Sequence, residues 1–225
     1  MALLNTYGDE YVPTSGTHGA DIASQRCDEL DMEAISFAKQ IPNAFILDVG
    51  CGYGAQSVRF AAQGAKVVAI DIVNTVEHIH QSLRELSLSF DFVDFENSDI
   101  ESYLERCSTR FDIIYSQRFI HYLHPLRAKS VVKKFFEILN SGGAVFVSAS
   151  GIGSELSNNY SSVKKDISER FGFLSEQMQE KHGIKEPVCL YSPDELRDLF
   201  LEAGFQLKHI WESNFGNVKA VFVKT

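Results

Sequence analysis

The stretch Phe45-Ile46-Leu47-Asp48-Val49-Gly50-Cys51-Gly52-Tyr53-Gly54 decides the fold of this 225-residue chain. Its first half is an apolar run interrupted only by Asp48, which predicts a buried strand. Its second half has glycine at every other position, and glycine lets a backbone turn tightly and approach a ligand closely. The stretch therefore predicts a strand that runs through a ligand-binding turn into a helix.

Beyond this stretch, short apolar runs alternate with amphipathic segments, which is the pattern of a parallel sheet covered by helices. We expect strands at 45–49, 66–70, 92–97, 111–115 and 144–148. Between them, apolar residues recur at helical spacing. They are Val76, Ile79, Leu83 and Leu86 in one helix, and Leu126, Val132, Phe135, Phe136 and Leu139 in another that begins near Pro125 and ends at Gly142.

The last quarter of the chain predicts a helix followed by a hairpin. Ser192-Pro193-Asp194-Glu195 has the form of a capping box, and Gly204 ends the helix. Two alternating runs, 205–211 and 218–223, then predict an antiparallel pair. The predicted fold is α/β: a doubly wound, mostly parallel seven-stranded sheet with helices on both faces and one antiparallel strand, from the C-terminal hairpin, at an edge.

The length suits one domain, so we expect residues 1–225 to form a single unit. Residues 1–40 form an N-terminal helical extension or cap, whose helix places Cys27, Leu30, Ala34, Phe37 and Ala38 on one face. Residues 151–190 form a long insertion before the capped helix. Long excursions of this kind are often functional, so we expect it to act as a lid.

Composition excludes several classes of function. A net charge of -9 and a pI near 5.2 argue against a broad nucleic-acid surface. The four cysteines, Cys27, Cys51, Cys107 and Cys189, are too scattered for a metal site, so we expect no metal. The sequence shows neither a signal peptide nor an apolar run of about 20 residues, so we expect a cytoplasmic protein with no membrane partner. The oligomeric state stays open.

The glycine turn by itself fits two cofactors. Gly50-x-Gly52-x-x-Ala55 satisfies the looser nicotinamide fingerprint. Asp48, however, would face a pyrophosphate with like charge, whereas it suits the cationic sulfonium and ammonium groups of S-adenosylmethionine. Asp71 ends the next strand, where ribose hydroxyls are held in either cofactor class. The residues favour S-adenosylmethionine and keep an NAD(P)-dependent oxidoreductase as an alternative.

The ordered motifs make the chain resemble the class I S-adenosylmethionine-dependent methyltransferases over roughly residues 40 to 225. The glycine stretch and Val67-Val68-Ala69-Ile70-Asp71 carry the resemblance first. Asn97-Ser98-Asp99-Ile100 is similar to the family's adenine-contacting acidic loop. Phe111-Asp112-Ile113-Ile114 is similar to its fourth strand, and Leu139-Asn140-Ser141-Gly142-Gly143 to the turn before its fifth.

The resemblance implies a role for each of these positions. Residues expected to bind the cofactor are Asp48, Gly50, Cys51, Gly52 and Gly54 around the methionine part, Asp71 at the ribose with Ile72 next to it in the chain, Asp99 and Ile100 at the adenine, and Gln117 near the sulfonium. The segment after the fourth strand faces the methyl group in such enzymes. There we expect the catalytic residues His121, Arg118 and Tyr122.

The expected activity is transfer of a methyl group to an oxygen or nitrogen, less readily a sulfur or carbon, of a small-molecule acceptor, with S-adenosyl-L-homocysteine as product. His121 is the candidate general base, since imidazole titrates near neutral pH; a structural histidine is the equal alternative. Two further functions compete with this one: a protein or RNA methyltransferase, and a non-catalytic, cofactor-binding regulatory subunit.

Overall fold

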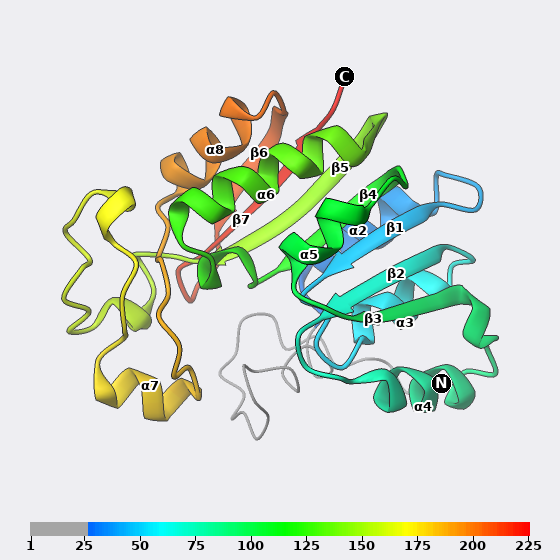
Figure 1. Ribbon diagram of the computed structural model, residues 1–225, viewed down its shortest axis with the longest axis horizontal. Coiled ribbons are helices and arrows are strands. Elements are labelled where there is room, and N and C mark those ends of the chain that lie inside the picture. Colours follow the sequence, from blue (N-terminus) through cyan, green and yellow to red (C-terminus); the bar gives the residue numbers. More distant parts are fainter. Residues whose placement is uncertain (1–26) are drawn as a thin grey trace.

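The computed structural model describes residues 27–225, and the part of the predicted N-terminal extension before residue 27 lies outside the described residues. A seven-stranded sheet runs through the molecule in the order β3-β2-β1-β4-β5-β7-β6 (Figure 1). Its strands are β1 Phe45–Val49, β2 Lys66–Asp71, β3 Val93–Asn97, β4 Phe111–Gln117, β5 Leu139–Ser150, β6 Gln206–Glu212 and β7 Asn217–Val223. All the predicted strands are therefore present.

The reversed strand does not lie at the edge. β7 pairs antiparallel with both β5 and β6. It is therefore the second strand from the edge, and β6 is the edge strand. The chain passes from β5 to β6 through residues 151–190 and a helix and then returns through a tight turn. The hairpin thus fits β7 between β6 and β5.

Helices cover both faces of the sheet. On one face lie α2 Glu29–Ala38, α3 Ala55–Ala61 and α4 Val76–Glu85, whose apolar residues share one core cluster with Ile46 of β1. On the other face lie α5 Ile100–Arg106, α6 Pro125–Ile138 and α8 Pro193–Glu202 (Figure 1). The capping box predicted for α8 is present, with Ser192 accepting from the Glu195 amide. The doubly wound prediction is confirmed.

The predicted end of α6 is wrong. The helix stops at Ile138, and Leu139 has an extended backbone that opens β5 and pairs with Phe111. Gly142 lies inside β5, where its amide donates to the Lys224 carbonyl at 2.6 Å. Leu126 is 70% exposed and belongs to no core face. Leu139 continues the helical spacing of α6 although it belongs to β5, because the helix and the strand both bury apolar residues.

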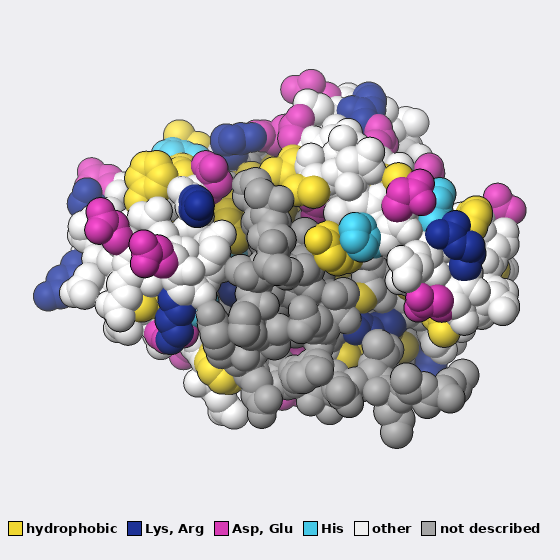
Figure 2. All heavy atoms as spheres, turned by 90° about the horizontal axis from the view of Figure 1, so that it is seen from below, with side chains coloured by type: hydrophobic (Ala, Val, Ile, Leu, Met, Phe, Trp, Pro, Cys, Tyr) yellow, Lys and Arg dark blue, Asp and Glu magenta, His cyan; other side chains and the backbone are white. Residues whose placement is uncertain are grey.

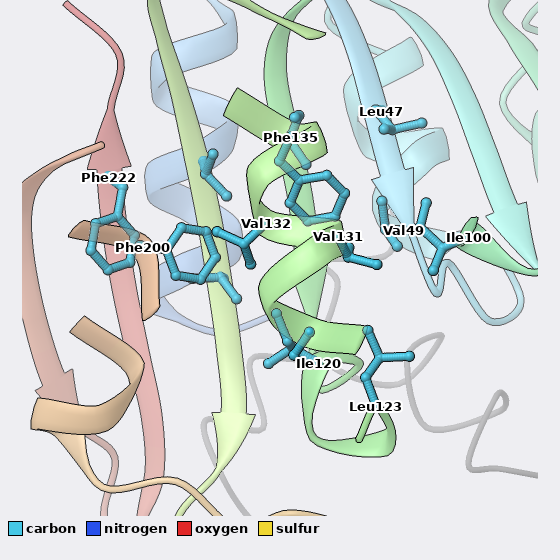
Figure 3. Close-up of a cluster of buried hydrophobic side chains, with 14 of the residues drawn as sticks. Leu47, Val49, Ile100, Ile120, Leu123, Val131, Val132, Phe135, Phe200 and Phe222 are labelled. Carbon is cyan, nitrogen blue, oxygen red and sulfur yellow. The ribbon is translucent and has the colours of Figure 1, made fainter. Parts of the chain in front are cut away.

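Packing behind the C-terminal half of the sheet comes mainly from aliphatic and aromatic side chains of α5, α6 and α8 (Figure 3). Phe200 of α8 stacks on Phe222 of β7 with ring centroids 4.4 Å apart. Val132 and Phe135 of α6 point to the same layer and are fully buried. Each such side chain contributes about 1.5–3 kcal/mol when removed from water, so this layer fixes the strand ends that carry the site.

Residues 151–190 form a lobe beside the carboxyl end of β5, with α7 Glu176–His182 at its far side (Figure 1). It contains its own apolar cluster: Leu156, Tyr160, Leu174, Met178, Ile184, Val188 and Leu190. The guanidinium of Arg170 ties the lobe to α8 by two hydrogen bonds to the Glu195 carboxylate, at 2.6 and 2.8 Å. The insertion is therefore a folded lobe, and its action as a lid stays a prediction.

The surface mixes the two signs of charge. On the face in Figure 2, acidic and basic side chains are interspersed, and neither forms a continuous field. Among residues 27–225 no helix has both the length and the apolar character needed to cross a membrane.

Candidate cofactor and acceptor site

The glycine turn connects β1 to α3 with all three glycines in the left-handed region. Their φ angles are 70° at Gly50, 54° at Gly52 and 77° at Gly54. A Cβ on Gly54 would lie 2.3 Å from Cγ1 of Ile79 in α4, and one on Gly50 would lie 2.9 Å from the ring of Phe119. Only glycine satisfies both the backbone and the space, so the turn forms a cradle that side chains would fill.

Asp48 lies beneath this cradle and is almost completely buried. Its Oδ2 accepts a hydrogen bond of 2.6 Å from the Ser57 hydroxyl of α3. Burial raises the pKa of Asp48 to about 7; Asp31 and Asp71 add to this effect, and the Ser57 bond opposes it. Asp48 is thus poised near neutrality between its acid and its charged form. Its role toward the cofactor stays a prediction.

Cys51, inside the turn, is buried, and burial together with the nearby Asp48 and Asp71 carboxylates raises the pKa of its thiol. A thiol in such surroundings stays protonated and is a poor nucleophile. The neighbouring Gly52 carbonyl accepts from the Thr75 hydroxyl at 2.7 Å. These contacts give the turn a fixed shape before any ligand binds.

Asp71 ends β2 directly opposite the turn. Its Oδ2 accepts from the Gly52 amide at 2.8 Å, and its Oδ1 accepts from the Val73 amide at 2.9 Å. These two hydrogen bonds fix the orientation of the carboxylate at the end of β2. The side chain of Asn97 holds the strand end in place by donating to the carbonyls of Asp71 and Ile72. Ile72 itself is 58% exposed beside them.

The predicted adenine residues lie on the next strand end. Asp99 caps α5, accepts from the Ser102 amide at 3.0 Å and has its pKa lowered by hydrogen bonds to Ser102. Ile100, in contrast, points into the core with Val49 and Val131 (Figure 3). The structure therefore brings Asp71, Ile72 and Asp99 to one edge of the sheet, while the side chain of Ile100 faces the interior.

The tip of β4 carries the remaining predicted residues. Gln117 donates a hydrogen bond to Asp28 at 2.7 Å, and Arg118 follows with a left-handed φ of 55°. The segment η3 Ile120–Tyr122 then places His121 and Tyr122 with their rings 4.3 Å apart. Gln117 lies on the α2 side of the sheet, whereas Tyr122 packs against the cluster of the lobe. The predicted catalytic segment thus connects β4 with the start of α2 and with the lobe.

His121 is buried, with its ring nitrogens 3.4 Å from the amide and the hydroxyl of Ser150. Burial, and after it the charge of Arg118, lowers the pKa of His121 to about 3. The ring is therefore neutral at physiological pH, and a base of this strength accepts a proton weakly. Its backbone carbonyl also accepts from the Cys189 amide at 2.8 Å, which attaches η3 to the end of the lobe.

Two buried hydroxyls near this segment have no hydrogen-bond partner within residues 27–225. They belong to Ser116, in β4, and Tyr191, whose amide donates to the Ser150 carbonyl at 3.0 Å. An unsatisfied buried polar group costs about 1–3 kcal/mol, so a ligand that supplies a partner gains that amount. An orphaned buried hydroxyl needs a partner, and a bound water or a ligand can be that partner.

Sequence reasoning missed a buried charge network on the other face. Lys219 of β7 is 1% exposed and lies 3.0 Å from the Asp28 carboxylate, while Asp31 accepts from the buried Tyr115 hydroxyl. Burial raises the pKa of Asp31 to about 6. Two signals could have found it: the capping-box pair Asp28 and Asp31 at the start of α2, and a lysine inside an otherwise apolar strand.

The seven-stranded sheet with its reversed β7, and the glycine turn that leads from β1 into α3, form a Rossmann-like fold. The comparisons with known proteins name the class. A family described as a methyltransferase domain matches residues 46–143. The structure is also similar to magnesium protoporphyrin IX methyltransferase from Synechocystis with S-adenosylmethionine bound, with a TM-score of 0.61 and 15% identity over 97% of this chain and 88% of that one.

Curated relatives agree with this class. A ubiquinone biosynthesis O-methyltransferase of Hydrogenovibrio crunogenus is 28% identical over 211 residues, 92% of this chain and 77% of the relative. Phosphoethanolamine N-methyltransferase 1 of Zea mays is 32% identical over 149 residues, which span 63% of this chain but 25% of the relative.

Residues 46–143 match a methyltransferase domain, and the chain is similar over most of its length to S-adenosylmethionine-dependent methyltransferases. We conclude that it is a methyltransferase enzyme with S-adenosylmethionine as its cofactor.

Proposed function

We propose that the enzyme transfers the methyl group to an oxygen or nitrogen of a small molecule held between the tip of β4 and the lobe of residues 151–190. The observation that carries this proposal is the pair of orphaned hydroxyls, on Ser116 and Tyr191. Both hydroxyls are buried, so the surface of a protein or an RNA is too large to supply their missing partner, and a small molecule suits the position better. The relatives named above, an O- and an N-methyltransferase, support an acceptor of this size and chemistry.

The cofactor would bind along the carboxyl edge of β1, β2 and β3. In this proposal the glycine cradle and Asp48 surround the methionine part, Asp71 receives the ribose hydroxyls, and Ile72 and Asp99 flank the adenine. When bound, S-adenosylmethionine would supply an electrophilic methyl group, and its sulfur would keep the electron pair of the carbon–sulfur bond that breaks as the bond to the acceptor forms.

The protein would accelerate this step by positioning. The tip of β4 is fixed on one side by the bond from Gln117 to Asp28 and on the other by Tyr122 in the lobe cluster. Holding two reactants in line lowers the activation barrier by up to about 7–11 kcal/mol. His121, with its pKa near 3, adds little as a base, so the acceptor proton would leave to water once the new bond has formed.

The test is a turnover assay that detects S-adenosylhomocysteine and the methylated product by mass spectrometry. The acceptors are small aromatic and aliphatic compounds that carry either hydroxyl or amine groups, with unfolded peptides and single-stranded RNA as the competing classes. Methylation of hydroxyl or amine compounds is expected. Methylation of only peptide or RNA would overturn the proposal, while the assignment of the methyl donor would stand.

A matched pair of variants tests the cofactor residues. Asp71→Asn retains the shape of the side chain but loses a charged acceptor, so we expect the Kd for S-adenosylmethionine to rise by about tenfold or more. Asp91→Asn, on the exposed segment η2 Phe90–Phe92, is the control and should leave the Kd unchanged. An unchanged Kd in Asp71→Asn would remove Asp71 from the site.

A further inference from the structure

Arg118 has a backbone conformation that is unfavourable for a residue with a side chain. It is the first residue after β4, and its φ of 55° lies in the left-handed region, where a Cβ is costly. The position is nevertheless fixed, because its amide lies 3.0 Å from both the carbonyl and the hydroxyl of Ser148. Glycine would meet these demands without strain. An arginine in such a place points to a use for its side chain.

The guanidinium of Arg118 has no hydrogen bond or ion pair among residues 27–225. The other described arginines are all engaged: Arg59, Arg106, Arg110, Arg127, Arg170 and Arg197 contact oxygen acceptors, and Arg84 lies over the ring of Phe90. Arg118 is also only partly exposed. A partly buried cation whose five donors lack an acceptor in the described part of the chain is incomplete by itself.

The surroundings of Arg118 place it in the acceptor region. Its charge acts on His121 and Tyr122 of η3, where it follows burial as a cause of their pKa shifts. It acts also on His182 of α7, whose pKa is lowered mainly by burial. Arg118 also follows β4 directly, and Tyr122, four residues later, packs against the lobe cluster, so the arginine lies at the tip of β4 on the way to the lobe. The acids Asp31 and Asp48 are influenced by Arg59 instead.

Resting on the proposed function, we propose that Arg118 binds an oxyanion on the methyl acceptor, so the acceptors of this enzyme carry a carboxylate or a phosphate. The planar guanidinium matches either group by two parallel hydrogen bonds. Such a contact would fix the acceptor at one end while its hydroxyl or amine faces the methyl group. It would also supply hydrogen-bond acceptors to the Arg118 donors.

The experiment compares acceptors in matched pairs: a hydroxybenzoate with its methyl ester, and an amino- or hydroxyphenyl phosphate with the corresponding neutral phenol. We expect wild type to prefer the anionic member of a pair by tenfold or more in kcat/KM. Arg118→Gln should abolish this preference through KM, and Arg118→Lys should restore part of it. The control is Arg197→Gln, on the exposed face of α8, which should keep the preference. The benzoate and phosphate arms tell which oxyanion is bound.

Arg118→Gly separates the side chain from the backbone. It removes the strain at φ 55°, so the melting temperature should hold or rise, yet the preference for anions should be lost as in Arg118→Gln. Equal kcat/KM for the two members of each pair in wild type would overturn the proposal. So would a preference that survives in both variants.

Calorimetry distinguishes failure of this inference from failure of the proposed function. Benzoate and phenyl phosphate are titrated into enzyme loaded with S-adenosylhomocysteine. Binding that Arg118→Gln abolishes, without methylation of any small acceptor, supports the oxyanion site and rejects the small-molecule function. Methylation of neutral acceptors without binding of either anion supports the small-molecule function and rejects the oxyanion site.

Discussion

Gln117 at the end of β4 donates a hydrogen bond of 2.7 Å to Asp28, which also lies 3.0 Å from the buried ammonium of Lys219. The contact joins the strand tip that carries the predicted catalytic segment to the start of α2, 89 positions earlier in the chain. The orientation of this tip therefore depends on a charge network inside the fold. This network can be tested by itself.

Lys219→Met should destabilise the protein by about 3–5 kcal/mol, because it leaves buried carboxylates without their cation. The double variant Lys219→Met with Asp28→Asn should recover much of that loss. Lys208→Met is the control: Lys208 is exposed and pairs with Glu33 at 3.2 Å, so its loss should cost less than about 1 kcal/mol. Urea unfolding measures all three. Equal effects of the two single variants would mean that the buried pair does not matter.

Gly54→Ala should be among the most damaging changes in the glycine turn. It combines a left-handed backbone with a Cβ only 2.3 Å from Ile79, at a cost of about 1–2 kcal/mol for the first and about 1–3 kcal/mol for the second. Gly64→Ala has a similar φ but open space around it, so only the first cost applies. Chemical denaturation gives the two free energies, and similar values would contradict the predicted steric role of Ile79.

Asp48→Asn should stabilise the protein at neutral pH. The folded pKa of about 7 lies above the ordinary value of 3.8, so folding favours the protonated acid. That stability is complete below pH 3.8 and is lost as the pH rises through 7. The amide mimics the neutral acid, and at pH 8 the gain is up to about 4 kcal/mol. Stability curves from pH 4 to 8 check this.

The same variant separates folding from binding. If Asp48 faces the cations of the cofactor, Asp48→Asn should bind S-adenosylmethionine about tenfold more weakly although it is more stable. Unchanged affinity in calorimetry at pH 8 would restrict Asp48 to a structural role.

His121→Gln should lower kcat by less than about a hundredfold, below the usual contribution of a general base, and should not change the shape of its pH profile from pH 5 to 9. The reason is that His121, with a pKa of about 3, is already neutral throughout that range. His124→Gln, at the partly buried N-cap of α6, is the control. An inflection near pH 6.5 in wild type that vanishes only in His121→Gln would restore the base assignment.

The buried His121 should also make the stability of the protein depend on pH in the acid range. Its folded pKa is lowered from 6.5 to about 3, so its contribution is present above pH 6.5 and is lost as the pH falls toward 3. His121→Gln should lose less stability than wild type between pH 6 and about pH 4 in matched melts.

Tyr191→Phe should change stability by less than about 1 kcal/mol, because within residues 27–225 its hydroxyl makes no hydrogen bond that the substitution could break. Tyr160→Phe is the matched control, since the Tyr160 hydroxyl donates to the Val188 carbonyl at 2.7 Å, and its loss should cost about 1–3 kcal/mol. If the Tyr191 hydroxyl serves the acceptor, Tyr191→Phe should raise KM while the melting temperature holds. Unchanged kinetics would exclude that role.

The sequence by itself determined the elements that depend on local pattern. Periodicity and the glycine, proline and capping residues predict the strand before Gly50, the capped helix after Ser192 and the terminal hairpin. The order of the motifs identified the methyl donor. The end of α6 at Ile138 was mispredicted because apolar spacing continued into β5. Local pattern does not distinguish two elements that bury the same kind of residue against one sheet.

Only the tertiary structure decided what surrounds each candidate side chain. In the sequence His121 fits a general base and a structural histidine equally well, and only the fold shows that burial lowers its pKa to about 3. Arg118 is one arginine among many until the fold shows that its guanidinium has no partner in the described part of the chain, and Lys219 becomes an interior cation only when α2 brings Asp28 to it. Charge and hydrogen bonding act through space, so the strength of each group is set by neighbours that the sequence separates widely.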